Sequence, residues 1–396
     1  MSAVELGPIS HGGERDYVAL CTICGQRASL TAYECARCSG PLILDMAAVR
    51  ASNECPGGGK ALGIWRHAHL LPRTMAAVSL GEGTTPLLPF IDVDNPGVEL
   101  WLKAEHLNPT LSFKDRAMAL AASIAVDRRV TGLVLASTGN AAASAAPYAA
   151  AAGLPCQVFY GSTSGAARKL AVAHAFGAQT TEVKGDYSTA YAAVVAAEED
   201  GWMNVTTTYR NPVLAEAYRT TAAEIIEDLG DAPDVVIVPV GAGPLLHGLR
   251  QGFRDAIDAG QIDREPRMVG VQAAACAPLA AAWTSDDWLT SLRQPMDVGV
   301  TSATAIADAL RGYEEQGLIT LNDVRDSGGA LVAVSEETIL AAQGRLRAAG
   351  HLVEAASATA LAGLTTAACK VRLVPGSRVV LMMTGHGAKE RLASAA

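Results

Sequence analysis

The sequence predicts an α/β protein in which two open parallel-sheet domains follow a small cysteine-rich ribbon. Short β-branched or apolar runs alternate with alanine-rich helical stretches from about residue 61 onward. Buried parallel strands that helices cover on both faces read as continuous apolar runs of this kind. Four of the eight cysteines fall within residues 21–38, which sets the ribbon apart from the rest of the chain.

Composition excludes several classes of protein. A chain of 396 residues, with 50% hydrophobic and 18% charged residues, is long enough for about two to three domains. Its net charge of −9 opposes attraction to nucleic acid or to anionic membranes. No apolar stretch approaches the ~18 residues of a membrane-spanning helix, and the first residues lack a signal-peptide pattern. We therefore expect a cytoplasmic protein that binds neither nucleic acid nor membrane.

The ribbon, residues 1–45, has the spacing of a zinc site. Cys21 and Cys24 form one C-x2-C pair, and Cys35 and Cys38 form a second pair ten residues later. Two such knuckles bring four thiolates onto one tetrahedral ion, which leaves no open position and therefore predicts structural Zn²⁺. The alternatives are four ordinary buried cysteines or a redox pair.

A glycine-rich connector at residues 52–60 leads into the α/β region. Seven strands are predicted there: 133–137, 157–161, 180–183, 235–240, 268–272, 330–334 and 379–384. Their spacing suggests a small α/β domain at 115–207. The large α/β domain then comprises 46–114, with an amino-terminal arm, and 208–396. Sites in such folds lie beyond the carboxyl ends of the strands, so the turns there are the informative ones.

Two of these turns offer hydrogen-bond donors. Gly241, Ala242 and Gly243 follow the most hydrophobic strand and open a helix, an arrangement that suits a phosphate. The alternative is simply a tight connection. The stretch STGN at 137–140 offers hydroxyls and an amide that suit a carboxylate, or it caps the following helix.

Two further positions complete the candidate site. Lys114, in the stretch NPTLSFKDR, has apolar neighbours that would lower its pKa and leave a nucleophilic amine. The alternative is a solvated lysine in the first turn of a helix. Thr384 lies at the end of the last predicted strand, where its hydroxyl could face a ring nitrogen.

Together these positions match the needs of pyridoxal phosphate: a lysine for its aldehyde, donors for its phosphate, and partners for its ring oxygen and nitrogen. GEGTTPLL, NPTLSFKDR, STGN, a glycine-rich loop after VPV, and TGHGAKE occur in the order seen in threonine synthases of the fold-type II pyridoxal-phosphate family. The cysteine ribbon, GIWRHAHLLP and AGHLVEAASATALAGL are also similar. The chain resembles that family over nearly its whole length.

The resemblance implies roles for individual residues. Lys114 would form a Schiff base with the cofactor and then move protons at the substrate's carbons. Asn140 would hydrogen-bond the ring oxygen, and Thr384 would face the pyridine nitrogen. Ser137 and Thr138 would hold the carboxylate of a small amino-acid substrate.

The phosphate of the cofactor would be bound by amides of the loop after residue 240. The resemblance assigns this role to Gly241, Ala242, Gly243 and Leu245. The implied reaction is γ-elimination of phosphate from O-phospho-L-homoserine, followed by β-addition of water to give L-threonine. A homodimer is the family's habit and is expected on that ground.

Several positions depart from the family's pattern. Leu111 stands where Gly is usual, and Ala141 and Ala142 replace hydroxyl residues that would contact a substrate phosphate. Pro244 interrupts the amide donors, because proline has no N–H. Val205 replaces another polar position.

Three cations are left as candidates to bind the anionic group of the substrate: Arg210, Arg116 and Lys103. Unpaired polar groups in the substrate pocket cost about 1–3 kcal/mol each, so the alanines favour a different leaving group or a different amino acid. The alternatives to the threonine synthase reaction are a related β- or γ-elimination or replacement, dehydration of serine or threonine, and an inactive scaffold that keeps the fold.

Overall fold

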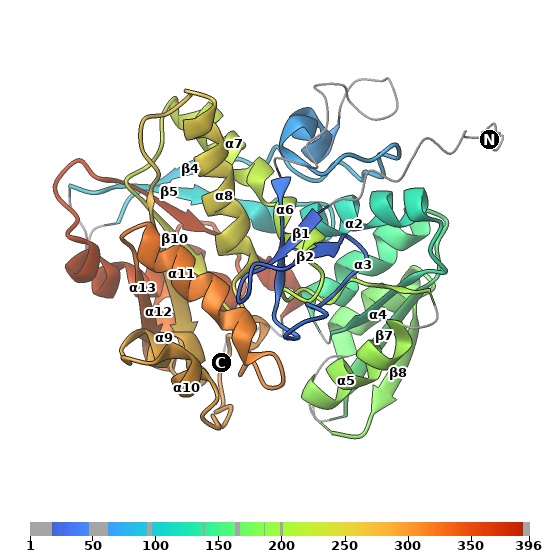
Figure 1. Ribbon diagram of the computed structural model, residues 1–396. Helices are drawn as coiled ribbons and strands as arrows, with labels where there is room; N and C mark the ends of the chain where they lie inside the picture. The colour runs from blue at the N-terminus through green and yellow to red at the C-terminus, as the bar shows by residue number, and fades with distance from the viewer. Residues whose placement is uncertain are drawn as a thin grey trace.

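Two α/β sheets and a small antiparallel ribbon make up the protein (Figure 1). The structure is a computed structural model, and it describes residues 18–46, 62–92, 97–137, 139–162, 167–185, 187–198 and 201–390. The predicted connector at 52–60 lies outside this part of the chain. Figure 1 shows the larger sheet with its helices on the left and the smaller one on the right.

The larger sheet has six strands in the order β12-β11-β10-β13-β5-β4. Their bounds are β4 Leu87–Phe90, β5 Glu99–Lys103, β10 Val235–Pro239, β11 Arg267–Ala273, β12 Ala330–Val334 and β13 Arg378–Met382. All neighbouring pairs are parallel except the edge pair β4 and β5. Parallel sheets are therefore confirmed, with one antiparallel strand at an edge.

The smaller sheet has four parallel strands in the order β8-β7-β6-β9. Their bounds are β6 Leu133–Ala136, β7 Cys156–Gly161, β8 Gln179–Val183 and β9 Met203–Asn204. These strands all fall within the segment predicted as the small domain, and the six strands of the larger sheet all fall outside it. All seven strands predicted from the sequence are present, within two residues of their predicted ends.

Helices cover both faces of the sheets (Figure 1). The α-helices are α2 Lys114–Arg128, α3 Asn140–Ala151, α4 Ala167–Ala175, α5 Tyr187–Ala197, α6 Val213–Glu216, α7 Arg219–Leu229, α8 Pro244–Asp258, α9 Pro278–Trp283, α10 Trp288–Leu292, α11 Gly317–Asp326, α12 Glu336–Ala348 and α13 Ala355–Val371. Short 3₁₀ turns are η1 Gly63–Leu70, η2 Glu105–Leu107, η4 Thr304–Ile306, η5 Glu314–Gln316 and η6 Gly387–Lys389.

Burial on both faces explains why the central strand β10 is apolar throughout. Val236 and Val238 belong to the hydrophobic core that contains α8 and α11, whereas Val235 and Ile237 belong to the core that contains α12 and α13. Successive side chains of a strand point to opposite faces, so burial on both faces requires an uninterrupted apolar run. The carboxyl end of this strand consequently opens between two packed helical layers.

The ribbon packs against the smaller sheet rather than standing apart. Its strands are β1 Val18–Cys21, β2 Arg27–Ser29 and β3 Leu42–Leu44, and both pairings are antiparallel. The Tyr33 hydroxyl accepts a hydrogen bond of 2.9 Å from the amide of Asn204, and Leu42 belongs to the main hydrophobic core. No helix in the described ranges is long and apolar enough to cross a membrane.

Candidate active site

Lys114 is the first residue of α2 and lies where that helix meets the larger sheet. Its neighbour Asp115 fixes the start of the helix by accepting hydrogen bonds from the Thr110 amide at 2.6 Å and the Ser144 hydroxyl at 2.5 Å. The Lys114 ammonium lies 4.4 Å from the centre of the Phe113 ring. Burial lowers the pKa of Lys114 to about 7, against the opposing charge of Asp308. A substantial fraction of this amine is therefore neutral and nucleophilic near neutral pH.

Thr384 lies beside the segment that carries Lys114. The Phe113 amide donates a hydrogen bond of 3.1 Å to the Thr384 carbonyl. The Thr384 hydroxyl is 3.1 Å from the Ser357 hydroxyl, which also accepts a hydrogen bond of 2.8 Å from Gly385. The structure therefore brings the predicted ring-nitrogen partner next to the predicted nucleophile.

Asn140 reaches the same place from the smaller sheet, as the first residue of α3. Its Nδ2 donates a hydrogen bond of 2.7 Å to Oε2 of Glu354, while its buried Oδ1 has no partner. A Cβ on Gly385 would lie 2.3 Å from Glu354 Oε2 and 3.0 Å from Asn140 Nδ2, so only glycine allows this approach. The unpaired oxygen of Asn140 indicates that a ligand belongs beside it.

Glu354 was not predicted as a site residue. It is 1% exposed, and its Oε1 lies 2.8 Å from the Lys169 ammonium of α4. The stretch AGHLVEAASATALAGL had been noted only for its similarity, although a carboxylate inside an apolar run was a signal of a paired, buried role.

The loop after β10 has the form of an anion site. Gly243 has φ +110°, and a Cβ there would lie 2.0 Å from the Thr320 hydroxyl oxygen, so glycine is required. Pro244 begins the 15-residue helix α8. Within the described ranges, the amides of residues 241–243 donate no hydrogen bond. Free amides at a helix N-terminus attract a phosphate.

Asp308 joins this loop to the lysine. A Cβ on Gly241 would lie 3.5 Å from the Asp308 Cβ, and Lys114 is the charged group whose field acts on the Asp308 carboxylate. This acid was missed because it lies in a loop between η4 and η5, which follows no strand. The site is thus built from Lys114, Asn140, Thr384, the loop at 241–243 and Asp308.

Ser137 caps α3. Its hydroxyl oxygen accepts hydrogen bonds from the amides of Gly139 at 3.0 Å and Ala142 at 3.3 Å. This is the capping alternative considered from the sequence. Thr138, its predicted companion for the substrate carboxylate, lies outside the described residues.

Lys103 and Arg116 have partners that a substrate would have to displace. Both are 0% exposed. Arg116 donates to Glu105 at 2.7 Å and to Glu224 at 2.7 Å, and Lys103 donates to Glu224 at 2.8 Å. Burial alone would raise the pKa of Glu224, but the two cations hold it far below its usual range. Their contacts therefore argue for a structural role and against the substrate role predicted for them.

Arg210 is also tied to carboxylates. It contacts Glu198 at 2.6 Å and Glu34 of the ribbon at 2.8 Å, and its guanidinium lies over the Tyr33 ring. It therefore attaches the ribbon to the segment after β9. Sequence reasoning missed this role because Glu34 lies 176 positions away in the chain.

The four ribbon cysteines lie together, as their spacing predicted. Their sulfur atoms are all within 4.8 Å of one another, and the Cys21–Cys38 and Cys24–Cys35 separations are 3.5 and 3.6 Å. Zinc bonds of ~2.3 Å place the sulfurs of a tetrahedral site about 3.8 Å apart, so the cluster could hold this metal.

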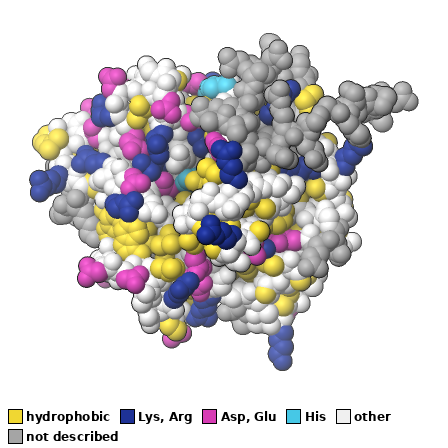
Figure 2. Space-filling view, in the orientation of Figure 1, with side chains coloured by type: hydrophobic (Ala, Val, Ile, Leu, Met, Phe, Trp, Pro, Cys, Tyr) yellow, Lys and Arg dark blue, Asp and Glu magenta, His cyan; other side chains and the backbone are white. Residues whose placement is uncertain are grey.

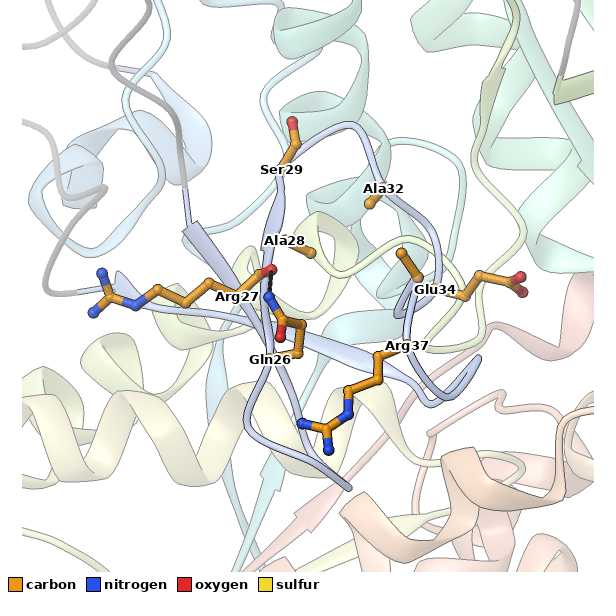
Figure 3. Close-up of a pocket in the computed structure, with 8 residues that line it drawn as sticks. Gln26, Arg27, Ala28, Ser29, Ala32, Glu34 and Arg37 are labelled. Carbon is orange, nitrogen blue, oxygen red and sulfur yellow. Dashed lines mark hydrogen bonds between the residues drawn. The ribbon is translucent and has the colours of Figure 1, made fainter.

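A pocket on the ribbon is a separate feature. It is lined by Arg27, Glu34 and Arg37 among others, and none of the residues predicted for the cofactor lines it. Figure 3 shows Arg27 and Glu34 pointing in opposite directions. On the face of the molecule in Figure 2, basic and acidic side chains are interspersed rather than gathered into one patch.

The fold and this site define a class of enzyme. A lysine of low pKa, a glycine-rich loop with free amides and an unpaired asparagine oxygen together fit pyridoxal phosphate. A family model described as pyridoxal-phosphate dependent enzyme matches residues 78–385, and the chain belongs to this family.

Within it, the chain is similar to threonine synthases. It is 37% identical to the threonine synthase of Mycobacterium bovis over 79% of this chain and 84% of that protein. It is 32% identical to the threonine synthase of Methanosarcina acetivorans over 94% of this chain and 92% of that protein. These relatives support a threonine synthase-like role.

Solved structures agree on the fold. The processed form of threonine deaminase isoform 2 from Solanum lycopersicum superposes with a TM-score of 0.61 at 22% identity, over 76% of this chain and 83% of that one. Maize serine racemase superposes with a TM-score of 0.64 at 19% identity, over 76% and 89%. The α/β architecture is therefore shared with both of these proteins.

Proposed function

We propose that the protein is a pyridoxal-phosphate-dependent carbon–oxygen lyase that acts on the side chain of a small α-amino acid. The observation that carries this proposal is the position of Lys114, whose amine of lowered pKa faces a site with free amides and an unpaired asparagine oxygen. Bound there, the cofactor would withdraw electrons from the α-carbon of an attached amino acid.

Each residue of the site then has a task. Lys114 would hold the cofactor through its amine and, once released, carry a proton to or from the substrate's carbons. The amides of residues 241–243 would bind the phosphate, and Asn140 would donate to the ring oxygen through the second hydrogen of its Nδ2, since the first goes to Glu354. Thr384 presents a neutral hydroxyl, which stabilises a protonated ring nitrogen less than a carboxylate would. That choice favours elimination at the side chain over transamination.

The first candidate reaction is that of the threonine synthase relatives named above. It would release phosphate from O-phospho-L-homoserine and add water to give L-threonine. Its support is the 32–37% identity over most of the chain.

A second candidate is elimination or replacement on an amino acid whose side chain carries no phosphate. It is favoured by the buried Ala141 and Ala142, which offer no side-chain donors, and by the carboxylate partners of Lys103, Arg116 and Arg210. None of these five side chains is placed to bind a second phosphate.

The test is the visible spectrum and the activity of the purified protein. We expect a yellow holoenzyme whose visible band is absent from Lys114→Ala and retained in Lys389→Arg. Lys389 is a suitable control because burial lowers its pKa to about 8, yet its amine donates to the Thr110 carbonyl at 2.9 Å. A colourless wild-type protein that does not take up cofactor would favour the scaffold alternative.

The ribbon completes the proposal with a structural Zn²⁺ on Cys21, Cys24, Cys35 and Cys38. The homodimer and the cytoplasmic location remain predictions.

A further inference from the structure

Asp308 places a carboxyl group at the candidate active site, beside the loop at 241–243. It is next to Gly241 of the phosphate loop, and its carboxylate acts electrostatically on the amine of Lys114. The residue as a whole is half-buried, but burial of its carboxyl group raises the pKa of Asp308, against the hydrogen bonds from Tyr313 and Leu310 and the charge of Lys114. Asp308 is therefore near both the loop and the lysine.

The position of this carboxylate is fixed. Its Oδ1 accepts a hydrogen bond of 2.9 Å from the Leu310 amide and one of 2.7 Å from the Tyr313 hydroxyl. No residue in the described part of the chain donates to Oδ2. One oxygen is thus anchored, and the other is available as an acceptor.

A group of tyrosines surrounds the anchored side. Tyr313 packs against Tyr191 of α5, with ring centres 4.8 Å apart, and it hydrogen-bonds Tyr187 of the same helix. Because α5 belongs to the smaller sheet, the Asp308 loop is held between the two α/β units. A carboxylate held on both sides cannot easily turn away from a bound substrate.

Apart from Lys114, no cation in the described ranges lies beside Asp308 to bind the phosphate of a phosphorylated substrate. Lys114 is the charged group that acts on Asp308, and it is assigned to the cofactor. No other lysine or arginine of the described ranges lies within ion-pair distance of Asp308. A phosphorylated side chain would therefore meet an acidic group with no cation beside it, whereas a hydroxyl would meet an acceptor.

We propose that Asp308 determines specificity, selecting amino acids whose side chain ends in an uncharged hydroxyl and disfavouring their phosphate esters. The proposal rests on the function proposed above, because it assumes that substrate binds beside Lys114. It assigns the substrate to the class of β- or γ-hydroxy amino acids.

Two probes that differ by one phosphoryl group test this inference. L-homoserine and O-phospho-L-homoserine are titrated into the holoenzyme, and Kd is read from the change in the visible band. We expect wild type to bind L-homoserine at least about tenfold more tightly. In Asp308→Asn this preference should fall by about tenfold or more, because the charge is removed and the shape is kept.

Two variants separate selectivity from folding. Tyr313→Phe removes an anchor but keeps the charge, so the preference should persist. Asp286→Asn removes an exposed acid on the loop after α9 and should behave as wild type. Tighter binding of O-phospho-L-homoserine by wild type would overturn the inference, as would an equal change in both Kd values in Asp308→Asn. Absence of any visible band would instead contradict the proposed function.

Discussion

Two cations in the first turn of α2 have opposite surroundings. Arg116 is fully buried and is bound by the carboxylates of Glu105 and Glu224, which raise its pKa despite the effect of burial. Lys114, two residues earlier, has no ion pair within the described ranges, and burial lowers its pKa to about 7. The surroundings stabilise the charged form of Arg116 and destabilise the charged form of Lys114.

The difference separates a structural cation from a reactive one. A buried ion pair must satisfy its charges locally, and removing one partner leaves the other uncompensated. A desolvated lysine without a partner reduces the stability of the fold. Its presence at the start of α2, beside the carboxyl ends of the strands, therefore indicates a function. Both residues are buried cations, so charge and burial alone do not distinguish them. The presence or absence of carboxylate partners does.

The largest effect is expected on the free energy of unfolding, when each of the two cations is replaced by methionine. Arg116→Met leaves Glu105 buried without a cation and Glu224 with Lys103 alone, and should lower the free energy of unfolding by about 3–5 kcal/mol. Lys114→Met should leave the stability of the apoprotein unchanged or higher. Urea unfolding of the two apoprotein variants measures both. Similar losses in both variants would contradict the contrast.

Zinc removal should have the next largest effect. Freshly purified protein should contain about one zinc per chain, and Cys24→Ser should lose it and unfold the ribbon, since the ribbon strands have three to four residues each. Cys156→Ser, outside the cluster, should keep the metal. Metal analysis and thermal unfolding provide the measurements, and a metal-free wild type would remove the zinc proposal.

A smaller effect is expected from pH on cofactor capture. With a pKa of about 7, the neutral fraction of Lys114 rises about tenfold between pH 6 and pH 8, and the initial rate at which apoprotein gains its visible band should follow. An ordinary lysine would still be mostly protonated at pH 8, and its rate would keep rising towards pH 10. A rate that levels off only near pH 10 would show that the amine is not desolvated.

The smallest expected effect comes from the backbone before Lys114. Leu111 has φ +64°, in the left-handed region that disfavours L-residues by roughly 1–2 kcal/mol. Leu111→Gly should therefore stabilise the protein by up to about 1 kcal/mol, after the entropic cost of glycine. Arg129→Gly, at φ +53° on the other end of α2, is the matched control and should behave alike. Destabilisation by Leu111→Gly alone would point to a packing role for that side chain.

Local patterns predicted much of the fold and most of the residues that the structure brings together at the site. Runs such as VVIVP reveal a strand buried on both faces, and the turns that follow such strands led to Asn140, Thr384 and the loop at 241–243. The short edge strand β4 and its neighbour β5 were missed because neither is a continuous apolar run: Pro89 interrupts β4, and Glu99 begins β5.

Residues that act through distant partners could not be predicted in this way. Arg116 looked like an anion clamp because Glu224 lies 108 positions further along the chain. Asp308 and Glu354 have partners in the other α/β unit, Tyr187 through Tyr313 for Asp308 and Asn140 for Glu354, and no local pattern shows these contacts. The departure at Leu111 was visible in sequence, but its positive φ was not.

The central claim is a covalent bond between the cofactor and one lysine. Holoenzyme is reduced with borohydride, digested and analysed by mass spectrometry. We expect the mass of the reduced cofactor on the peptide that contains Lys114 and on no other. The modification on Lys169 or Lys389, or no modified peptide from a protein that has the visible band, would contradict the account.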